Sequence, residues 1–118
     1  MWYSLCTDNS ILMGAKKRTF NELITQSEIP VLVDFYATWC GPCQALSPVV
    51  SDVANNFKGE LKVIKVDVDK NQQAALKYGI QGVPTLILFQ KGKILWRKSG
   101  LMTRKELSKL IQGAMHKN

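Results

Sequence analysis

The sequence predicts an α/β domain in which a central mixed β-sheet is flanked by helices on both faces. Three observations support this prediction. Apolar strand patterns alternate with helical patterns, as βαβ units require. The segment 31–36 is apolar at all but one position, which is typical of a central strand that is covered on both sides. Two later strand patterns flank the turn residues Lys91 and Gly92, which indicates an antiparallel hairpin.

The first half of the chain reads as helix, strand, helix and strand. A short helix is predicted from Thr19 to residue 27, because Thr19 and Glu22 have the spacing of a capping box. The apolar strand 31–36 follows it. The second helix is predicted over 42–57, where apolar residues recur at helical spacing. The next strand is predicted over 61–68.

The second half reads as helix, strand, strand and helix. A short helix over 72–78 is ended by Gly79. The hairpin strands are predicted over 85–90 and 94–98. Thr103 and Glu106 form a second capping box, which opens the last helix. A parallel βαβ half followed by a hairpin and a helix gives a mixed sheet between two helical layers.

Length and composition indicate one globular domain. A chain of 118 residues can bury roughly two thirds of its unfolded surface. We expect residues 1–12 to be a short, loosely ordered N-terminal extension and residues 13–118 to form a single domain. No run of 18 apolar residues suggests a membrane helix, and no signal peptide is visible. Three cysteines are an odd number, and two of them lie in one short motif, which is not the disulfide framework of a small secreted domain, so we expect a reducing compartment such as the cytoplasm.

The net charge of +7 is concentrated in the second half of the chain. Residues 1–57 carry three basic and five acidic side chains, whereas residues 58–118 carry 13 basic and four acidic ones. This asymmetry indicates either an attractive field for acidic partners or simply solvated faces of a turn and a helix. Nucleic-acid binding is not expected, because Trp96 is the only aromatic residue near the basic clusters.

Two cysteines, Cys40 and Cys43, are separated by two residues at the predicted junction between strand and helix. A thiol at this position faces the unpaired N–H groups and the positive dipole end of the helix, which stabilise a thiolate. The thiolate is the nucleophile in disulfide exchange. Pro42 suits the first helical position, because its missing N–H would be unsatisfied there. This arrangement predicts a redox site at Cys40 and Cys43.

Asp34 interrupts an otherwise apolar strand. Burial raises the pKa of a carboxyl group by desolvation. If the side chain lies beneath Cys43, it can accept the proton of that thiol directly or through water. The alternative is a structural aspartate that is hydrogen-bonded at the end of the strand.

A zinc site is the rival interpretation of the cysteine pair, and it would need two further ligands. Cys6 and His116 are the remaining candidates of the usual type, at opposite ends of the chain. No metal is therefore expected. Cys6 reads as an incidental cysteine, or else as an exposed thiol that is open to modification.

The string Trp39-Cys40-Gly41-Pro42-Cys43 resembles the active-site signature of the thioredoxin family. Asp34 lies six residues before Cys40, and Gly82-Val83-Pro84-Thr85 lies downstream, both as in that family. The resemblance runs from about residue 19 to about residue 114. It is closest to the y-type thioredoxins of cyanobacteria and chloroplasts, through residues 36–39 and Gln44. Many thioredoxins have Trp in place of Tyr36, and Lys or Arg in place of Gln44.

The resemblance implies the thioredoxin fold and a protein-disulfide reductase that serves electron transport and cell redox homeostasis. Cys40 would be the nucleophile and the more exposed sulfur, and Cys43 the more buried, resolving thiol. The two would form the redox-active disulfide. Gly41 and Pro42 resemble the reducing members, whereas disulfide oxidases and isomerases of this fold usually carry His before the second cysteine.

The resemblance also implies the surroundings of the cysteines. Lys65 would lie beside Asp34 and support it. A cis peptide bond between Val83 and Pro84 would face the sulfurs, and Ala37 would lie near them. The residues expected to bind substrate are Trp39, Gly41, Pro42, Gly82, Val83, Pro84 and Gly100.

The expected partners are disulfide-containing target proteins, such as peroxiredoxins, and a thioredoxin reductase that depends on NADPH or ferredoxin. No bound cofactor, nucleic acid or membrane is implied, and a monomer is expected. The compartment would be the cytoplasm, or the plastid stroma in a photosynthetic eukaryote. The alternative is a thioredoxin-fold binding module in which the cysteines are dispensable and the basic C-terminal half is the docking face.

Overall fold

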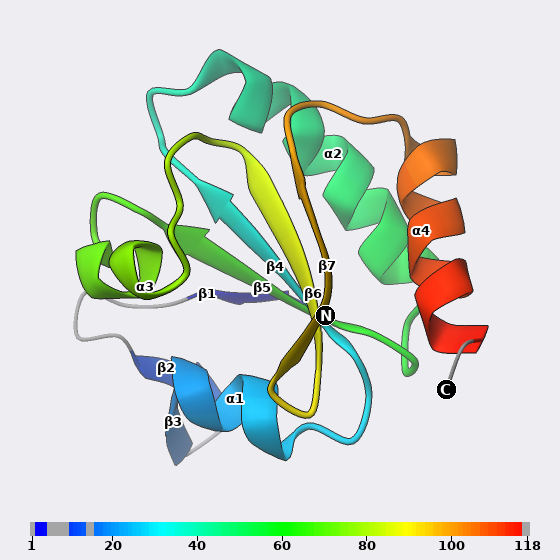
Figure 1. Ribbon diagram of the computed structural model, residues 1–118, viewed down its shortest axis with the longest axis horizontal. Helices are drawn as coiled ribbons and strands as arrows, with labels where there is room; N and C mark the ends of the chain where they lie inside the picture. The colour runs from blue at the N-terminus through cyan, green and yellow to red at the C-terminus, as the bar shows by residue number, and fades with distance from the viewer. Residues whose placement is uncertain (1, 5–9, 14–15, 117–118) are drawn as a thin grey trace.

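The computed structural model of the protein describes residues 2–4, 10–13 and 16–116, with side chains from residue 20 to residue 115. Helices and strands follow one another along the chain as shown in Figure 1. The elements are β1 (Trp2–Ser4), β2 (Ser10–Met13), β3 (Lys16–Thr19), α1 (Phe20–Gln26), β4 (Val31–Tyr36), α2 (Gly41–Asn56), β5 (Lys62–Asp67), α3 (Gln72–Lys77), β6 (Thr85–Gln90), β7 (Lys93–Ser99) and α4 (Arg104–His116).

The main sheet is mixed, as predicted. Its five strands lie in the order β1-β5-β4-β6-β7. β1, β5 and β4 are parallel to one another, and β6 is antiparallel to both β4 and β7. Helices α1 and α3 cover one face, and α2 and α4 cover the other (Figure 1). The thioredoxin-type architecture expected from the sequence is therefore confirmed.

The face under α1 and α3 holds an aromatic cluster. Phe20, Phe35, Tyr78 and Phe89 meet mostly edge to face, with ring centroids 5.4–6.3 Å apart. Alternate residues of β4 point to this face, because successive side chains of a strand point to opposite sides. This cluster anchors the sheet on the side away from the cysteines.

The face under α2 and α4 receives the other residues of β4. Leu32 packs there against Leu46 of α2 and Leu107 of α4, and all three are fully buried. Asp34 lies two residues after Leu32 and therefore points to the same face. The alternation along β4 places this carboxyl group beneath the N-terminal half of α2.

The last helix begins with the predicted capping box. The Thr103 N–H donates to Glu106 Oε1 at 2.9 Å, and the Glu106 N–H donates to Thr103 Oγ1 at 3.1 Å. This reciprocal pair satisfies two N–H groups that a helix end leaves without partners. No helix in the described part of the chain is long and apolar enough to cross a membrane.

The N-terminal strands were not expected from the sequence. β1 pairs with β5, and β2 pairs with β3 in a separate hairpin. The basic run 16–18 lacks the apolar alternation that identifies a strand. Residues 1 and 5–9 lie outside the described residues, so the division into an extension (1–12) and a domain (13–118) stays a prediction.

Candidate active site

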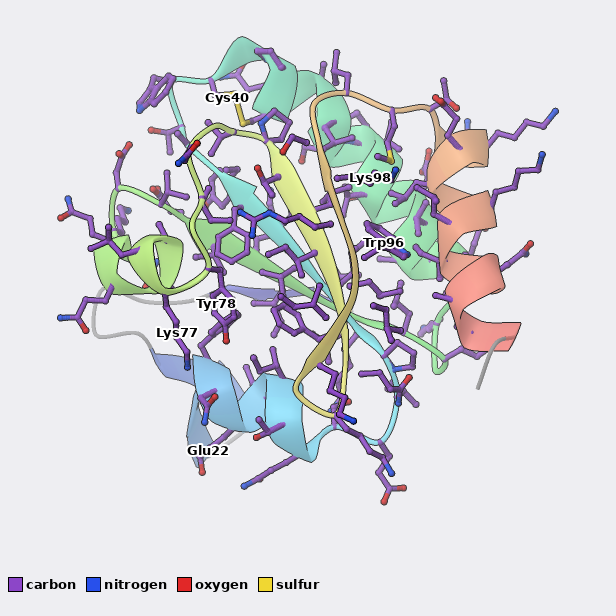
Figure 2. The ribbon with its side chains drawn as sticks, in the orientation of Figure 1. Glu22, Cys40, Lys77, Tyr78, Trp96 and Lys98 are labelled. Atoms are coloured by element: carbon purple, nitrogen blue, oxygen red, sulfur yellow. A yellow bond between two sulfur atoms is a disulfide. The ribbon has the colours of Figure 1, made fainter. Side chains whose placement is uncertain are left out.

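Cys40 lies at the N-terminal end of α2 (Figure 2) and is its capping residue. Its backbone is extended, and its Sγ accepts a hydrogen bond from the Cys43 N–H at 3.1 Å. Cys40 and Cys43 form a disulfide, with their Cα atoms 5.3 Å apart. The helix begins at Gly41, so Pro42 is its second residue rather than its first. The N–H that proline lacks is unpaired at that position too.

Both cysteines are buried, with exposed fractions of 4% for Cys40 and 5% for Cys43. The expectation that Cys40 is the more exposed of the two is therefore wrong for this disulfide form. The cause is the loop before β6, which lies over Cys40 and brings the Val83 carbonyl oxygen to 3.7 Å from its Sγ. The Val83–Pro84 peptide bond in this loop is cis, as expected.

Asp34 is almost fully buried, with an exposed fraction of 2%. Within the described part of the chain, its Oδ1 has no hydrogen-bond partner. Burial raises the pKa of this carboxyl group from its ordinary value of 3.8 to about 6, although the nearby charge of Lys65 opposes the shift. A carboxyl group with this pKa changes its protonation state close to neutral pH, as a proton acceptor in a catalytic step must.

A cavity of about 190 Å³ connects Asp34 with Cys43. Tyr36, Ser47 and Lys65 also line it. The cavity is large enough for water and offers it several polar groups. Lys65 Nζ donates to Ser47 Oγ at 3.4 Å and lies 4.8 Å from the centre of the Tyr36 ring. The arrangement can therefore carry a proton between the Cys43 thiol and the Asp34 carboxylate.

Trp39 is the most exposed aromatic residue at the site, with an exposed fraction of 72%. Its indole Nε1 donates to Asp69 Oδ2 at 2.8 Å, which fixes the ring beside the cysteines. Trp39, Gly82 and Val83 line a second, mainly apolar cavity of about 140 Å³. This surface can receive an apolar part of another protein close to Cys40.

The remaining residues expected to bind substrate lie around the same end of the sheet. Gly41 and Pro42 are exposed on the first turn of α2. Gly100 has a φ of +92°, which favours glycine, and its N–H donates to the Pro84 carbonyl at 3.0 Å. This bond ties the loop that covers Cys40 to the end of β7.

Sequence reasoning missed Asp69 and Ser47. Asp69 follows the carboxyl end of β5, the parallel strand next to β4. Functional residues often follow the carboxyl ends of parallel strands, so this position could have identified it. Ser47 carries no signal of its own within the pattern of α2. Cys6 and the side chain of His116, the further ligands that the zinc alternative would need, lie outside the described residues.

A comparison with protein-family models matches residues 12–113 to the family described as Thioredoxin. Thioredoxin 1 from Chlorobaculum tepidum is 41% identical over 98 residues, which cover 83% of this chain and 97% of the relative. Thioredoxin Y1, chloroplastic, from Arabidopsis thaliana is 42% identical over 113 residues, covering 93% of this chain and 64% of the relative. A solved mutant thioredoxin from Halobacterium salinarum has a TM-score of 0.78 at 35% identity, covering 96% of this chain and 89% of its own.

The disulfide joins two cysteines at the start of α2, a helix that packs on this mixed sheet. Together, this fold and this disulfide define a dithiol–disulfide oxidoreductase. The chain belongs to the thioredoxin family, and it is a protein-disulfide reductase. Thioredoxins act on disulfide-containing target proteins and are reduced by thioredoxin reductase or ferredoxin–thioredoxin reductase.

Proposed function

We propose that this protein reduces disulfides in partner proteins by a two-step exchange in which Cys40 is the nucleophile and Cys43 resolves the intermediate. The position of Cys40 at the N-terminus of α2 carries this proposal. Its sulfur accepts a backbone N–H, and the first turn of α2 has no acidic side chain to compete for the dipole. Both features favour the thiolate of Cys40.

In the first step, the Cys40 thiolate attacks one sulfur of the substrate disulfide. The substrate S–S bond breaks, and its other sulfur leaves as a thiolate that takes a proton from solvent. The product is a mixed disulfide between Cys40 and the substrate. The substrate approaches over the exposed indole of Trp39, since the loop around Val83 covers the other side of Cys40.

In the second step, Cys43 attacks the Cys40 sulfur and releases the reduced substrate. Asp34 accepts the proton of the Cys43 thiol, directly or through water in the cavity between them. Lys65 supports Asp34 by favouring its ionised form. Two electrons pass to the substrate, and the protein is left with the Cys40–Cys43 disulfide, which a reductase must reduce.

The substrate-binding surface would comprise the exposed residues around the sulfurs. The apolar cavity beside Trp39 suits an apolar side chain next to the substrate cysteine, and the backbone at Val83 suits strand-like pairing with an extended segment. The proposed members of this surface are Trp39, Gly41, Pro42, Gly82, Val83, Pro84 and Gly100.

The partners would be peroxiredoxins or other disulfide-bearing proteins, and the electron donor a reductase that uses NADPH or ferredoxin. The relatives include a bacterial thioredoxin and a chloroplastic one, so both kinds of donor are proposed. We further propose that the protein acts as a monomer in the cytoplasm, or in the plastid stroma of a photosynthetic eukaryote.

Reduction of insulin with dithiothreitol as electron source tests the roles of the cysteines. We expect strong catalysis by the wild type, loss of catalysis in Cys40→Ser, and a trapped mixed disulfide in Cys43→Ser. Cys6→Ser is the matched control, since it removes the third cysteine and should leave the rate unchanged. Catalysis by Cys40→Ser at the wild-type rate would overturn the assignment and favour a binding module.

A further inference from the structure

A groove lies between β7 and α4, away from the cysteine pair. β7 is an edge strand of the main sheet, with β6 as its only neighbour there. The groove has a volume of about 540 Å³. Trp96 and Leu110 form part of its lining, and the Trp96 Nε1 donates to the Leu110 carbonyl at 3.2 Å. This bond fixes the indole between strand and helix, so the groove has a rigid apolar surface.

Gly113 lies on the helix side of the groove and is exposed. A Cβ atom added to this residue would meet nothing within 4 Å, even though the residue lies inside α4. Glycine lowers helix stability by about 1 kcal/mol relative to alanine, so α4 gains no stability from it. Leu95 and Ala114 add apolar surface beside it. The groove therefore has room for a side chain of another molecule.

Two lysines, Lys98 and Lys109, complete the lining, one from β7 and one from α4. Figure 2 shows Lys98 and Trp96 on the side of β7 that faces α4. In the part of the chain that the structure describes, neither lysine forms an ion pair. Both ammonium groups are therefore available to an acidic ligand.

The charge around the groove is strongly positive. Residues 91–118 contain eight lysines and arginines but one acidic residue, Glu106. The carboxylate of Glu106 accepts the Thr103 N–H, which keeps it at the start of α4. An apolar lining with a positive rim is complementary to an acidic segment that carries an apolar side chain.

We propose that the groove between β7 and α4 binds a short acidic segment of a partner protein, which inserts an aliphatic or aromatic side chain beside Trp96. Its volume is in the range of small-ligand sites, which suits a few side chains. The pairing of β6 with β7 is irregular between Leu88 and Phe89, so β7 is a poor template for an added strand. The segment is held by side chains in the groove and not by strand pairing.

This docking surface is separate from the redox site. A partner held there does not cover the surface around Trp39, so docking raises the affinity for disulfide-bearing partners that carry such a segment. Reduction of insulin should not depend on the groove, since no redox-site residue lines it, and it serves as the measure of an intact redox site. The proposal is therefore independent of the roles assigned above to individual redox-site residues.

The test uses a fluorescein-labelled ten-residue peptide in which glutamates flank a leucine and a phenylalanine, with binding followed by fluorescence anisotropy. Two variants change the groove: Gly113→Leu fills it, and the double variant Lys98→Glu/Lys109→Glu reverses its charge. The matched control, Lys93→Glu/Lys105→Glu, also changes one lysine of β7 and one of α4, but neither residue lines the groove.

We expect saturable binding that weakens with salt, and about tenfold weaker binding in both groove variants than in the control. Insulin reduction should be equal in all four proteins. No saturable binding at about 1 mM peptide would overturn the proposal. Equal losses in the groove and control double variants, with none in Gly113→Leu, would also overturn it, since they would show unspecific attraction. Equally tight binding of a single-stranded oligonucleotide would also overturn the proposal, because it would show unspecific attraction of anions.

Discussion

Asp34 and Lys65 are register partners on the neighbouring parallel strands β4 and β5, and both side chains line the cavity beneath Cys43. The lysine charge lowers the pKa of the aspartate, and burial raises it by more. The two effects together leave the carboxyl group with a pKa of about 6. The pair therefore holds a proton acceptor close to neutrality inside the protein.

The stability of the protein should depend on Asp34 and on pH. Between pH 3.8 and about 6, the folded state holds a proton that the unfolded chain has released, so stability falls as pH rises through this window. Above it, Asp34→Asn should be up to about 3 kcal/mol more stable than the wild type. Urea unfolding from pH 3 to pH 8 measures this difference. It should vanish near pH 3, and a difference that is constant with pH would contradict the assigned pKa.

The same substitution should slow the chemistry. Asp34→Asn removes the proposed proton acceptor for Cys43, so the mixed disulfide at Cys40 should resolve more slowly, while the first attack keeps its rate. Stopped-flow measurement of mixed-disulfide turnover from pH 6 to pH 9 separates the two steps. Equal turnover in both proteins across this range would remove Asp34 from the mechanism.

Lys65→Gln should shift the pH dependence of resolution to higher pH. The lysine charge opposes the rise in the Asp34 pKa that burial causes, so without it that pKa should exceed 6. The rate of resolution against pH, measured as above, reports this shift. In the background of Asp34→Asn, the lysine substitution should leave the profile in place. A shift that persists in that background would show that Lys65 acts on another group.

Trp39→Ala should weaken substrate binding more than it changes stability. The indole is 72% exposed, so its removal should alter the free energy of unfolding by less than about 1 kcal/mol. The apolar surface beside Cys40 would shrink, so KM for a protein disulfide should rise more than kcat falls. Asp69→Ala should have a weaker effect in the same direction, because it releases the indole without removing it. A fall in kcat at constant KM would place Trp39 in the chemical step.

The capping box of α4 gives a prediction about stability alone. Thr103→Ala removes the hydroxyl that accepts the Glu106 N–H, and should destabilise the protein by about 1 kcal/mol. Insulin reduction should be unchanged. Lys105→Ala is the control, since it changes an exposed residue of the same turn without touching the cap. Thermal unfolding of the three proteins compares them, and equal midpoints would show that the cap contributes nothing.

The sequence predicted most of the fold because its strands and helices carry regular apolar patterns. The turn between β6 and β7 and the capping-box spacings at residues 19–22 and 103–106 are further local signals. β1 and β3 lack such signals. β1 is short and pairs with β5, far along the chain, and the basic run 16–18 of β3 has no apolar alternation. The burial of Cys40 depends on Val83, which is 43 residues away, so no local pattern could have indicated it. The same is true of the bond between Trp39 and Asp69, which span 30 residues.

The alternation along β4 has a consequence for insertions and deletions. Asp34 faces α2 only because it is an even number of residues from Leu32, while Phe35 faces the aromatic cluster. One residue inserted between Leu32 and Asp34 would keep a strand there but exchange its two faces beyond that point. The carboxyl group would enter the aromatic cluster, and the cavity beneath Cys43 would lose its proton acceptor. Residues can be gained or lost in the turns of this protein, but within β4 the count itself is under constraint.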